Sequence, residues 1–276
     1  MSGLGQAIAD GVLGGRLWLY ANYHCNLTCT YCLTESAPNV PRRELPVERL
    51  PELAAEARQA GFTALGVTGG EPFLVRGLPT ALAGMAAELP TVVLSNATLF
   101  TPRLLRDLEP LAGLDVAVQV SLDSAEPATN DEMRGPRNFA KVVEAIPRLR
   151  EGGLGVRIAT TTEGLEPDAL GRLCELHRSL GVSDDDHVVR PIVRRGRARD
   201  HDLGVEAAIG DLPAELTITA DGAFWSPFGP TVHGGRLDTD LLITRTTRPL
   251  TVPAEAMLRV AGAAGPRSSP DQLKIT

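Results

Sequence analysis

Apolar and β-branched residues gather in six short runs along the first two thirds of the chain, and stretches with a helical repeat separate these runs. Runs of this length and composition are typical of buried strands. Strands that alternate with helices predict an α/β protein with a parallel sheet. The six predicted strands are Leu17–Tyr23, Ala64–Thr68, Thr91–Ser95, Asp115–Leu122, Val156–Thr161 and His187–Val193.

The stretches between these runs carry apolar residues three or four positions apart, as amphipathic helices do. Residues 47–57 form one such stripe, and Gly61 is suited to end that helix. Residues 139–149 form a second stripe. A third helix is predicted to begin with Pro167 in its first turn and to end before Gly181.

Six strand–helix units are too few for the eight of a closed barrel. The pattern therefore predicts a partial, TIM-like (β/α)6 barrel that is open on one side. In folds of this kind the loops at the carboxyl ends of the strands converge on one mouth, where the chemistry takes place. Functional residues are therefore expected directly after each predicted strand.

The pattern changes after about residue 200. Leu216–Trp225 is strand-like but is interrupted by Asp221-Gly222, a strong signal for a hairpin. We divide the chain into an N-terminal leader segment (1–15), a core domain (16–200), a small C-terminal extension (201–261) and a flexible tail (262–276).

Acidic residues outnumber basic ones, 34 against 27, and the formal net charge is −7. Proteins that bind nucleic acid are usually basic, so nucleic acid is not an expected partner. The first 14 residues lack the basic start and apolar stretch of a secretory signal. No run of about 18 uncharged apolar residues indicates a membrane span. The expectation is a cytoplasmic protein.

Three of the four cysteines, Cys25, Cys29 and Cys32, lie within eight positions on the loop after the first strand. This spacing favours metal binding over a disulfide framework. Three thiolates on one loop can ligate three irons of a cubane and leave the fourth iron open. The alternative is a zinc site that adds His24 or another ligand, although zinc sites commonly draw on two separated ligand pairs. The fourth cysteine, Cys174, is interpreted as a core residue of a helix.

The segment Cys25-x-x-x-Cys29-x-Tyr31-Cys32 resembles the signature of the radical SAM superfamily, including the aromatic residue before the last cysteine. The resemblance implies a 4Fe–4S cluster whose open iron chelates the amino and carboxylate groups of S-adenosylmethionine (SAM). It also implies that Tyr31 lies against the adenine. In this family one electron, from a reducing partner such as flavodoxin or ferredoxin, converts SAM into methionine and a 5′-deoxyadenosyl radical.

Glycines and polar residues follow the next three predicted strands. Gly69-Gly70-Glu71-Pro72 resembles the family's Gly-Gly-Glu-Pro motif, which binds the SAM amino group; glycines let the backbone approach a ligand, and Glu71 offers an acceptor. Asn96, Ser121 and Asp123 resemble family elements that lie beside the ribose and carboxylate of SAM. The plainer interpretation of these residues is that they form turns or cap helices.

Two arginines complete the set of cofactor-binding candidates. Arg134 follows Asn130-Asp131 in a segment that resembles the family's His-Asp-x-x-Arg-Gly element, with Asn130 in place of the histidine. Its guanidinium would pair with the SAM carboxylate, or else face solvent. Arg190 begins an arginine-rich segment, residues 190–199, that is similar to a Gly-Arg-Ala segment of the family. We expect Arg190 to face the mouth and the other arginines to face water.

Residues 216–227 resemble the hairpin that opens the SPASM-like auxiliary-cluster domain of peptide-modifying radical SAM enzymes. Trp225, Ser226 and Pro227 stand where cysteines accompany that hairpin, and no cysteine follows Cys174. We therefore expect a single cluster.

The resemblance predicts an enzyme that abstracts hydrogen from a peptide, as in the maturation of ribosomally made natural products, or from a small metabolite. An epimerase or dehydrogenase of sugars or aminocyclitols is the alternative within the enzyme class. A non-catalytic Fe–S or zinc-binding module is the alternative outside it. No residue stands out as a catalytic acid, base or hydrogen donor.

Overall fold

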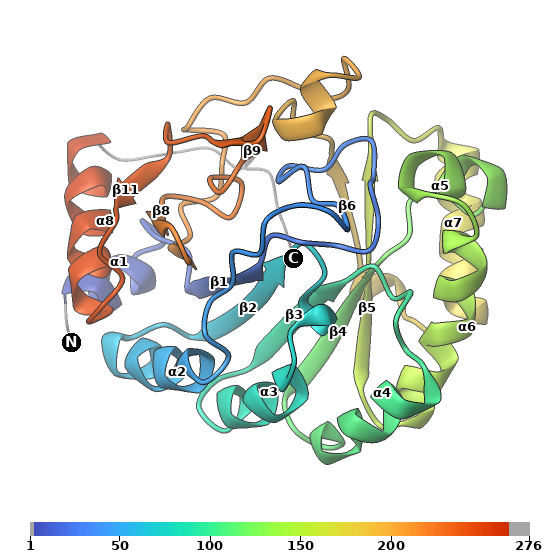
Figure 1. Ribbon diagram of the computed structural model, residues 1–276, viewed down its shortest axis with the longest axis horizontal. Coiled ribbons are helices and arrows are strands. Elements are labelled where there is room, and N and C mark those ends of the chain that lie inside the picture. Colours follow the sequence, from blue (N-terminus) through green and yellow to red (C-terminus); the bar gives the residue numbers. More distant parts are fainter. Residues whose placement is uncertain (1–2, 265–276) are drawn as a thin grey trace.

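Six parallel strands lie side by side in sequence order and form the larger part of a nine-stranded sheet (Figure 1). The computed structural model describes residues 3–264. Each predicted strand is confirmed, with ends that differ by at most two residues, and the sheet is open, as in a partial barrel. The six strands are β1 (Arg16–Asn22), β2 (Ala64–Gly69), β3 (Thr91–Ser95), β4 (Val116–Ser121), β5 (Gly155–Thr162) and β6 (His187–Pro191).

Helices connect consecutive strands and cover the outer face of the sheet (Figure 1). The predicted stripe of the first connecting helix is buried from Leu50 to Ala57, whereas Val47 precedes the helix and is partly buried. The helix ends at Gly61, whose φ of 104° lies in the left-handed region. The helices are α1 (Gly3–Ala9), α2 (Arg49–Ala60), α3 (Leu78–Ala86), α4 (Pro102–Leu108), α5 (Pro127–Arg134), α6 (Asn138–Glu151), α7 (Pro167–Ser179) and α8 (Thr251–Ala264).

The side chains of β1 alternate between the two faces of the sheet, as strand geometry requires. Leu17 and Leu19 are fully buried in the hydrophobic core, whereas Trp18 and Tyr20 line the concave face. A Cβ atom on Gly66 would lie within 3 Å of the Trp18 ring, so only glycine at this position of β2 leaves space for the indole. Trp18 therefore fills the lower part of the half-barrel, below its mouth.

The C-terminal extension adds three strands to the same sheet, beyond β1. β7 (Thr217–Thr219) pairs with β1 in parallel, and β8 (Gly222–Phe224) pairs with β7 in an antiparallel hairpin, as predicted at Asp221-Gly222. β11 (Leu242–Thr244) pairs with β8, while β9 (Val232–His233) and β10 (Arg236–Leu237) form a separate two-stranded ribbon. The domain boundary near residue 200 remains a prediction, but the strands after it continue the sheet of the core.

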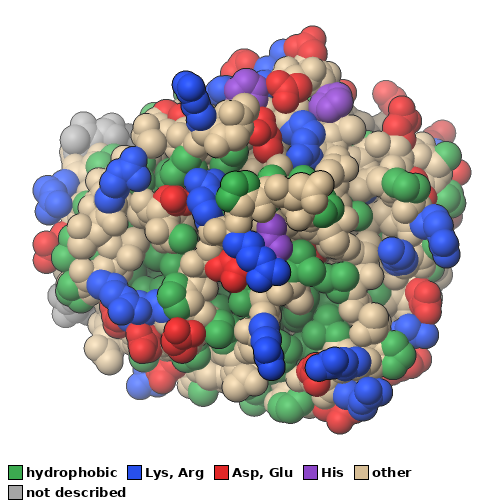
Figure 2. Space-filling view, in the orientation of Figure 1, with side chains coloured by type: hydrophobic (Ala, Val, Ile, Leu, Met, Phe, Trp, Pro, Cys, Tyr) green, Lys and Arg blue, Asp and Glu red, His purple; other side chains and the backbone are tan. Residues whose placement is uncertain are grey.

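The two ends of the described chain lie close together. The helix α1, within the predicted leader segment, packs beside α8 at the edge of the molecule (Figure 1). Residues 262–264 of the predicted tail belong to α8, and the rest of that tail lies outside the described residues. None of the helices within residues 3–264 combines the length and the apolar character that a bilayer crossing requires. On the face drawn in Figure 2, basic side chains are interspersed with acidic and uncharged ones.

The helix α7 buries a histidine against the sheet. The His177 ring is fully buried and meets His187 of β6 edge to face, with ring centroids 4.3 Å apart. Neither ring nitrogen of His177 has a hydrogen-bond partner in the described part of the chain. Burial, with a smaller contribution from His187, lowers the pKa of His177 to about 3. Cys174, three residues earlier, is half-buried and lies outside the hydrophobic core, so the interpretation of it as a core residue is wrong.

We expect His177 to make the stability of the protein pH-dependent. Because its pKa is depressed in the folded state, the unfolded chain binds the extra proton first, and stability falls as the pH drops below about 6.5. Between pH 6.5 and pH 5 the loss should be about 1–2 kcal/mol. Urea unfolding of the wild type and of His177→Leu at both pH values will measure it; equal pH dependence in the two proteins would contradict the assignment.

Candidate functional site

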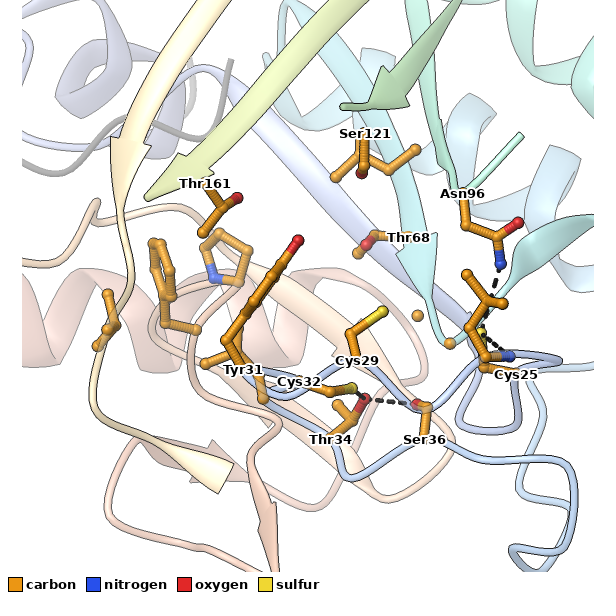
Figure 3. A pocket seen from close by; sticks show the side chains of 18 of the residues that line it. Cys25, Cys29, Tyr31, Cys32, Thr34, Ser36, Thr68, Asn96, Ser121 and Thr161 are labelled. Carbon is orange, nitrogen blue, oxygen red and sulfur yellow. Dashed lines mark hydrogen bonds between the residues drawn. The ribbon is translucent and has the colours of Figure 1, made fainter. Parts of the chain in front are cut away.

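The carboxyl ends of β1 to β6 surround one pocket, and the cysteine loop, residues 24–37, closes part of its mouth (Figure 3). The space inside, including the part open to solvent, is about 1060 Å³. The predicted site residues that line it are Cys25, Cys29, Tyr31, Cys32, Gly69, Gly70, Asn96, Ser121, Arg134 and Arg190.

The three cysteine sulfurs lie on one side of the pocket, opposite the ends of the strands (Figure 3). Cys25 is buried, and its sulfur lies 3.4 Å from the backbone nitrogen of Leu27 and 3.5 Å from Asn96 Nδ2. Burial raises the pKa of Cys25 to about 12 and that of Cys29 to about 11. The free thiols of Cys25 and Cys29 therefore keep their protons at neutral pH, and a metal must displace these protons on binding.

The spacing of the thiols separates the two metal interpretations. A single zinc ion about 2.3 Å from three sulfurs would hold those sulfurs within about 3.8 Å of one another. Among the described residues, the three cysteines do not form a group whose ligand atoms all lie within 4.8 Å of one another. His24, the additional zinc ligand considered above, points its Nδ1 at Glu44, 3.3 Å away, and does not line the pocket. The arrangement suits a cluster that spans several metal atoms.

Two arginines of the segment 190–199 hold the cysteine loop and the extension in place. The Arg197 guanidinium donates to the carbonyl oxygens of Cys29, at 2.6 Å, and Ser36, at 3.0 Å. Arg195 is 6% exposed and pairs with both carboxylate oxygens of Asp240, at 2.8 and 2.6 Å. The expectation that these arginines face water is therefore wrong, because each supplies hydrogen bonds that the loops need.

Gly70 allows the turn after β2 to lie directly on the start of the cysteine loop. Its backbone nitrogen donates to the carbonyl oxygen of Asn22 at 3.0 Å, and a Cβ atom on it would lie within 3 Å of the His24 carbonyl. Any larger residue would push these two segments apart. Gly69, with a φ of 139°, also has a conformation that favours glycine. The Gly-Gly pair therefore fixes the depth of this side of the pocket.

Glu71 lies behind the pocket wall rather than in it. Its side chain is fully buried, and burial raises the pKa of the carboxyl to about 7, although three hydrogen bonds donated to it oppose this rise. Its side chain caps the N-terminus of a short 3₁₀ turn, which is the capping role considered above as the alternative to SAM binding. The donors are the Phe73 backbone nitrogen at 3.1 Å, Ser95 Oγ at 3.0 Å and the Asn96 backbone nitrogen at 2.8 Å.

Tyr31, Asp123 and Arg134 form one hydrogen-bonded group at the end of β4. The Tyr31 hydroxyl lies 2.5 Å from Asp123 Oδ2, and Arg134 Nη1 donates to the same carboxylate oxygen at 3.0 Å and to the hydroxyl. Arg134 is 6% exposed, so it does not face solvent. Burial alone would lower the pKa of Arg134, but the charges of Tyr31 and Asp123 outweigh it and raise that pKa.

Asn130, the departure from the family element, supports this group from behind. Its side chain is fully buried, and its Oδ1 accepts a hydrogen bond from the Asp123 backbone nitrogen at 3.1 Å. Its Nδ2 donates to Asn138 Oδ1 at 2.9 Å. The Asn130 amide therefore forms hydrogen bonds with both Asp123 and Asn138, at a position where the family element has a histidine. These bonds hold the backbone of Asp123 in position.

Arg190 reaches the pocket from β6. Its Nε donates to Thr161 Oγ1 at 3.1 Å, and the Asp123 carboxylate favours its charged form without a direct ion pair among residues 3–264. Burial lowers the pKa of Arg190. Thr161 was not predicted as a site residue, although it ends a strand as the predicted residues do. The other lining residues that we missed include Tyr20, Thr34, Ser36, Thr68, Pro227 and Phe228.

The sequence matches a family model described as the radical SAM superfamily over residues 20–176. The chain belongs to the radical SAM superfamily. It is therefore an enzyme, and a 4Fe–4S cluster and SAM are its cofactors. The matched range contains the cysteine loop and the ends of β1 to β5.

Several curated radical SAM relatives are similar to this chain. An AdoMet-dependent heme synthase of Methanosarcina barkeri is 31% identical over 160 residues, which are 57% of this chain and 45% of that protein. A GTP 3′,8-cyclase of Bradyrhizobium diazoefficiens is 32% identical over 154 residues, 54% of this chain and 45% of that protein. The chain spans about half the length of these relatives.

Solved radical SAM structures share the fold. SuiB of Streptococcus suis bound to S-adenosylmethionine gives a TM-score of 0.54 at 17% identity, over 68% of this chain and 42% of that one. Native anSMEcpe with bound AdoMet gives a TM-score of 0.60 at 13% identity, over 87% of this chain and 80% of that one. At these identities the likeness concerns the architecture alone.

Proposed function

We propose that Cys25, Cys29 and Cys32 hold the 4Fe–4S cluster and that the pocket above them binds SAM and an organic substrate. The observation that carries this proposal is that three thiols and the predicted strand-end residues line one pocket. When bound, the reduced cluster supplies an electron that cleaves SAM to methionine and a 5′-deoxyadenosyl radical, which abstracts hydrogen from carbon. Flavodoxin or ferredoxin is the proposed source of the electron.

The chain's own groups would bind and orient SAM. Arg134 Nε is buried and has no hydrogen-bond partner in residues 3–264, so it is free to donate to the SAM carboxylate. Gly69 and Gly70 expose backbone at the pocket wall and suit the amino group. Glu71 would act indirectly, because its carboxylate holds the backbone of Asn96 at the pocket edge. Tyr31 and Ser121 would flank the adenosine.

We propose an anionic small molecule as the substrate. Arg190 presents a buried guanidinium that forms no direct ion pair among the described residues, although the charge of Asp123 acts on it, and a carboxylate or phosphate of the substrate would pair with it. Pro227 and Phe228 of the extension supply an apolar wall. The name of the relative GTP 3′,8-cyclase indicates that it acts on an anionic nucleotide, which supports this class.

A peptide substrate is the second candidate. The hairpin of β7 and β8 stands where peptide-modifying members of the superfamily begin their auxiliary domain, as the sequence resemblance indicates. A side chain presented at the pocket mouth would then be the group that loses hydrogen. A short precursor gene next to this one would favour the peptide, and genes for nucleotide or sugar metabolism would favour the small molecule.

The test is anaerobic incubation of the reconstituted protein with SAM and dithionite. We expect 5′-deoxyadenosine and methionine in equal amounts, measured by liquid chromatography, and faster formation when a true substrate is added. GTP and a precursor peptide are the first two compounds to compare. An intact cluster that yields no 5′-deoxyadenosine would refute the proposed function.

A further inference from the structure

A chain of buried hydroxyl groups leads from Cys32 into the protein (Figure 3). The Cys32 sulfur lies 3.5 Å from Thr34 Oγ1, and Thr34 Oγ1 lies 2.6 Å from Ser36 Oγ. Ser36 Oγ in turn donates to the Tyr23 carbonyl oxygen at 2.6 Å. Thr34 is 4% exposed and Ser36 is 2% exposed, so water does not compete for these bonds.

The number of hydrogens fixes the direction of each bond. A serine hydroxyl has one hydrogen, and Ser36 gives it to the carbonyl of Tyr23. Ser36 must therefore accept from Thr34, which uses the single hydrogen of Thr34. The remaining contact is then donated by the Cys32 thiol to Thr34 Oγ1. In the free protein every hydroxyl of the chain is satisfied in this one arrangement.

This arrangement cannot persist once Cys32 is a ligand, because a thiolate has no hydrogen to donate. On the basis of the proposed function, which places a cluster on Cys32, we propose that the Thr34 hydroxyl then turns from Ser36 to the Cys32 sulfur and raises the reduction potential of the cluster. Hydrogen bonds to ligating sulfurs tune cluster potentials, since they stabilise the added negative charge of the reduced state. Ser36 keeps its bond to Tyr23, so the rotation leaves no donor unpaired.

The surrounding backbone holds Thr34 within reach of the sulfur. Arg197 donates from its backbone nitrogen to the Cys32 carbonyl at 2.9 Å and from its guanidinium to the Ser36 carbonyl at 3.0 Å. A Cβ atom on Gly196 would lie within 3 Å of the Leu33 carbonyl, so the two segments are in direct contact. Thr34 therefore lies between two residues whose backbone is fixed from outside the loop.

The three cysteines differ in the hydrogen-bond donors that lie close to their sulfur atoms. Cys25 is close to two nitrogen donors, the Leu27 backbone and Asn96 Nδ2. The Cys29 thiol lies 3.8 Å from a carbonyl oxygen, that of Arg134, which cannot donate to a thiolate. Thr34 is the hydroxyl group beside Cys32, so it is a positioning residue whose effect should be specific to that ligand.

Redox titration of the reconstituted protein, followed by electron paramagnetic resonance, tests the proposal. Thr34→Val keeps the shape and removes the hydroxyl, and we expect its equilibrium constant for reduction to fall about tenfold, a shift of about 59 mV to more negative potential for one electron. Thr34→Ser should restore the wild-type potential. Ser36→Ala frees the Thr34 hydrogen and should leave the potential at or above that of the wild type.

Other outcomes would overturn the proposal. Equal potentials in wild type and Thr34→Val, both with an intact cluster, would show that the hydroxyl does not act on the sulfur. A negative shift of equal size in Ser36→Ala would assign the effect to loop packing instead. Failure of the proposed function is distinguishable, because the potential is measured without SAM: a protein without a 4Fe–4S cluster, or with one that does not cleave SAM, refutes the function itself.

Discussion

Replacing Cys29 with alanine will leave the reconstituted protein without a 4Fe–4S cluster and without cleavage of SAM. The variant would keep only two of the three thiolates that are proposed to hold the cubane. Among the described residues, no other cysteine lies near enough to replace Cys29. The loss of 5′-deoxyadenosine formation should exceed the 10–100-fold typical of changes to residues behind a metal ligand. Iron and sulfide content and the rate of 5′-deoxyadenosine formation measure the two effects.

Cys174→Ala is the matched control for this experiment. Cys174 is a free, half-buried cysteine on α7, outside the pocket lining, and its removal also costs one thiol. We expect full iron content and full activity in this variant. Retention of cluster and turnover by Cys29→Ala, or their loss in Cys174→Ala, would refute the assignment of the ligands.

Replacing Asp123 with alanine should lower the free energy of unfolding by about 3–5 kcal/mol, because it leaves the buried Arg134 without its counterion. The Tyr31 hydroxyl and the Thr161 backbone nitrogen would lose an acceptor in the same change. Urea denaturation of the cluster-free protein measures this loss. SAM affinity should fall as well, since Arg134 and Tyr31 would no longer be held in place.

Glu144→Ala provides the comparison for Asp123→Ala. Glu144 pairs with Arg148 at 2.8 Å, four residues apart on α6, and both side chains are exposed. An exposed pair of this kind contributes about 0.3–0.5 kcal/mol. If the two variants unfolded at the same urea concentration, the buried group around Asp123 would have no special role in stability.

The central sheet was predictable because the sequence pattern of each strand and helix is contained within that element. Each strand is a short apolar run and each helix has its own stripe, so β3 was predicted to the residue from Thr91 to Ser95. The position of β7 was not predictable in this way. The hairpin of β7 and β8 is visible at Asp221-Gly222, but the pairing of Trp18 with Thr217 joins distant segments. No local pattern specifies that partner.

In the candidate site, too, some features could be predicted from local sequence and others could not. Strand-end positions identified Asn96 and Ser121 as pocket residues, since parallel strands end at one edge of the sheet, and the family resemblance of its segment identified Arg134. Sequence position did not distinguish a group in the pocket from one directly behind it. Glu71 lies behind the wall because three donors from neighbouring segments converge on its carboxylate. Which donors converge is decided by tertiary packing.

The arginine-rich segment shows why burial was misjudged. A run of arginines is usually solvated, yet Arg195 is 6% exposed. Its partners, Asp240 and Thr231, are about 40 residues further along the chain. The hydroxyl chain of Thr34 and Ser36 was missed for a related reason, since two small polar residues in a loop are typical of an ordinary turn.

The position of β1 between β2 and β7 has a consequence for the order of events during synthesis. Trp18 and Leu19 pair with Thr217 and Ile218, and about 200 residues separate the partners. Until the ribosome has made that distant segment, one edge of β1 exposes unpaired backbone groups that can join another nascent chain. The cysteine loop leaves β1 directly, so its final geometry also depends on residues made late. We therefore expect the iron–sulfur cofactor to be inserted only after the segment that contains β7 has been made.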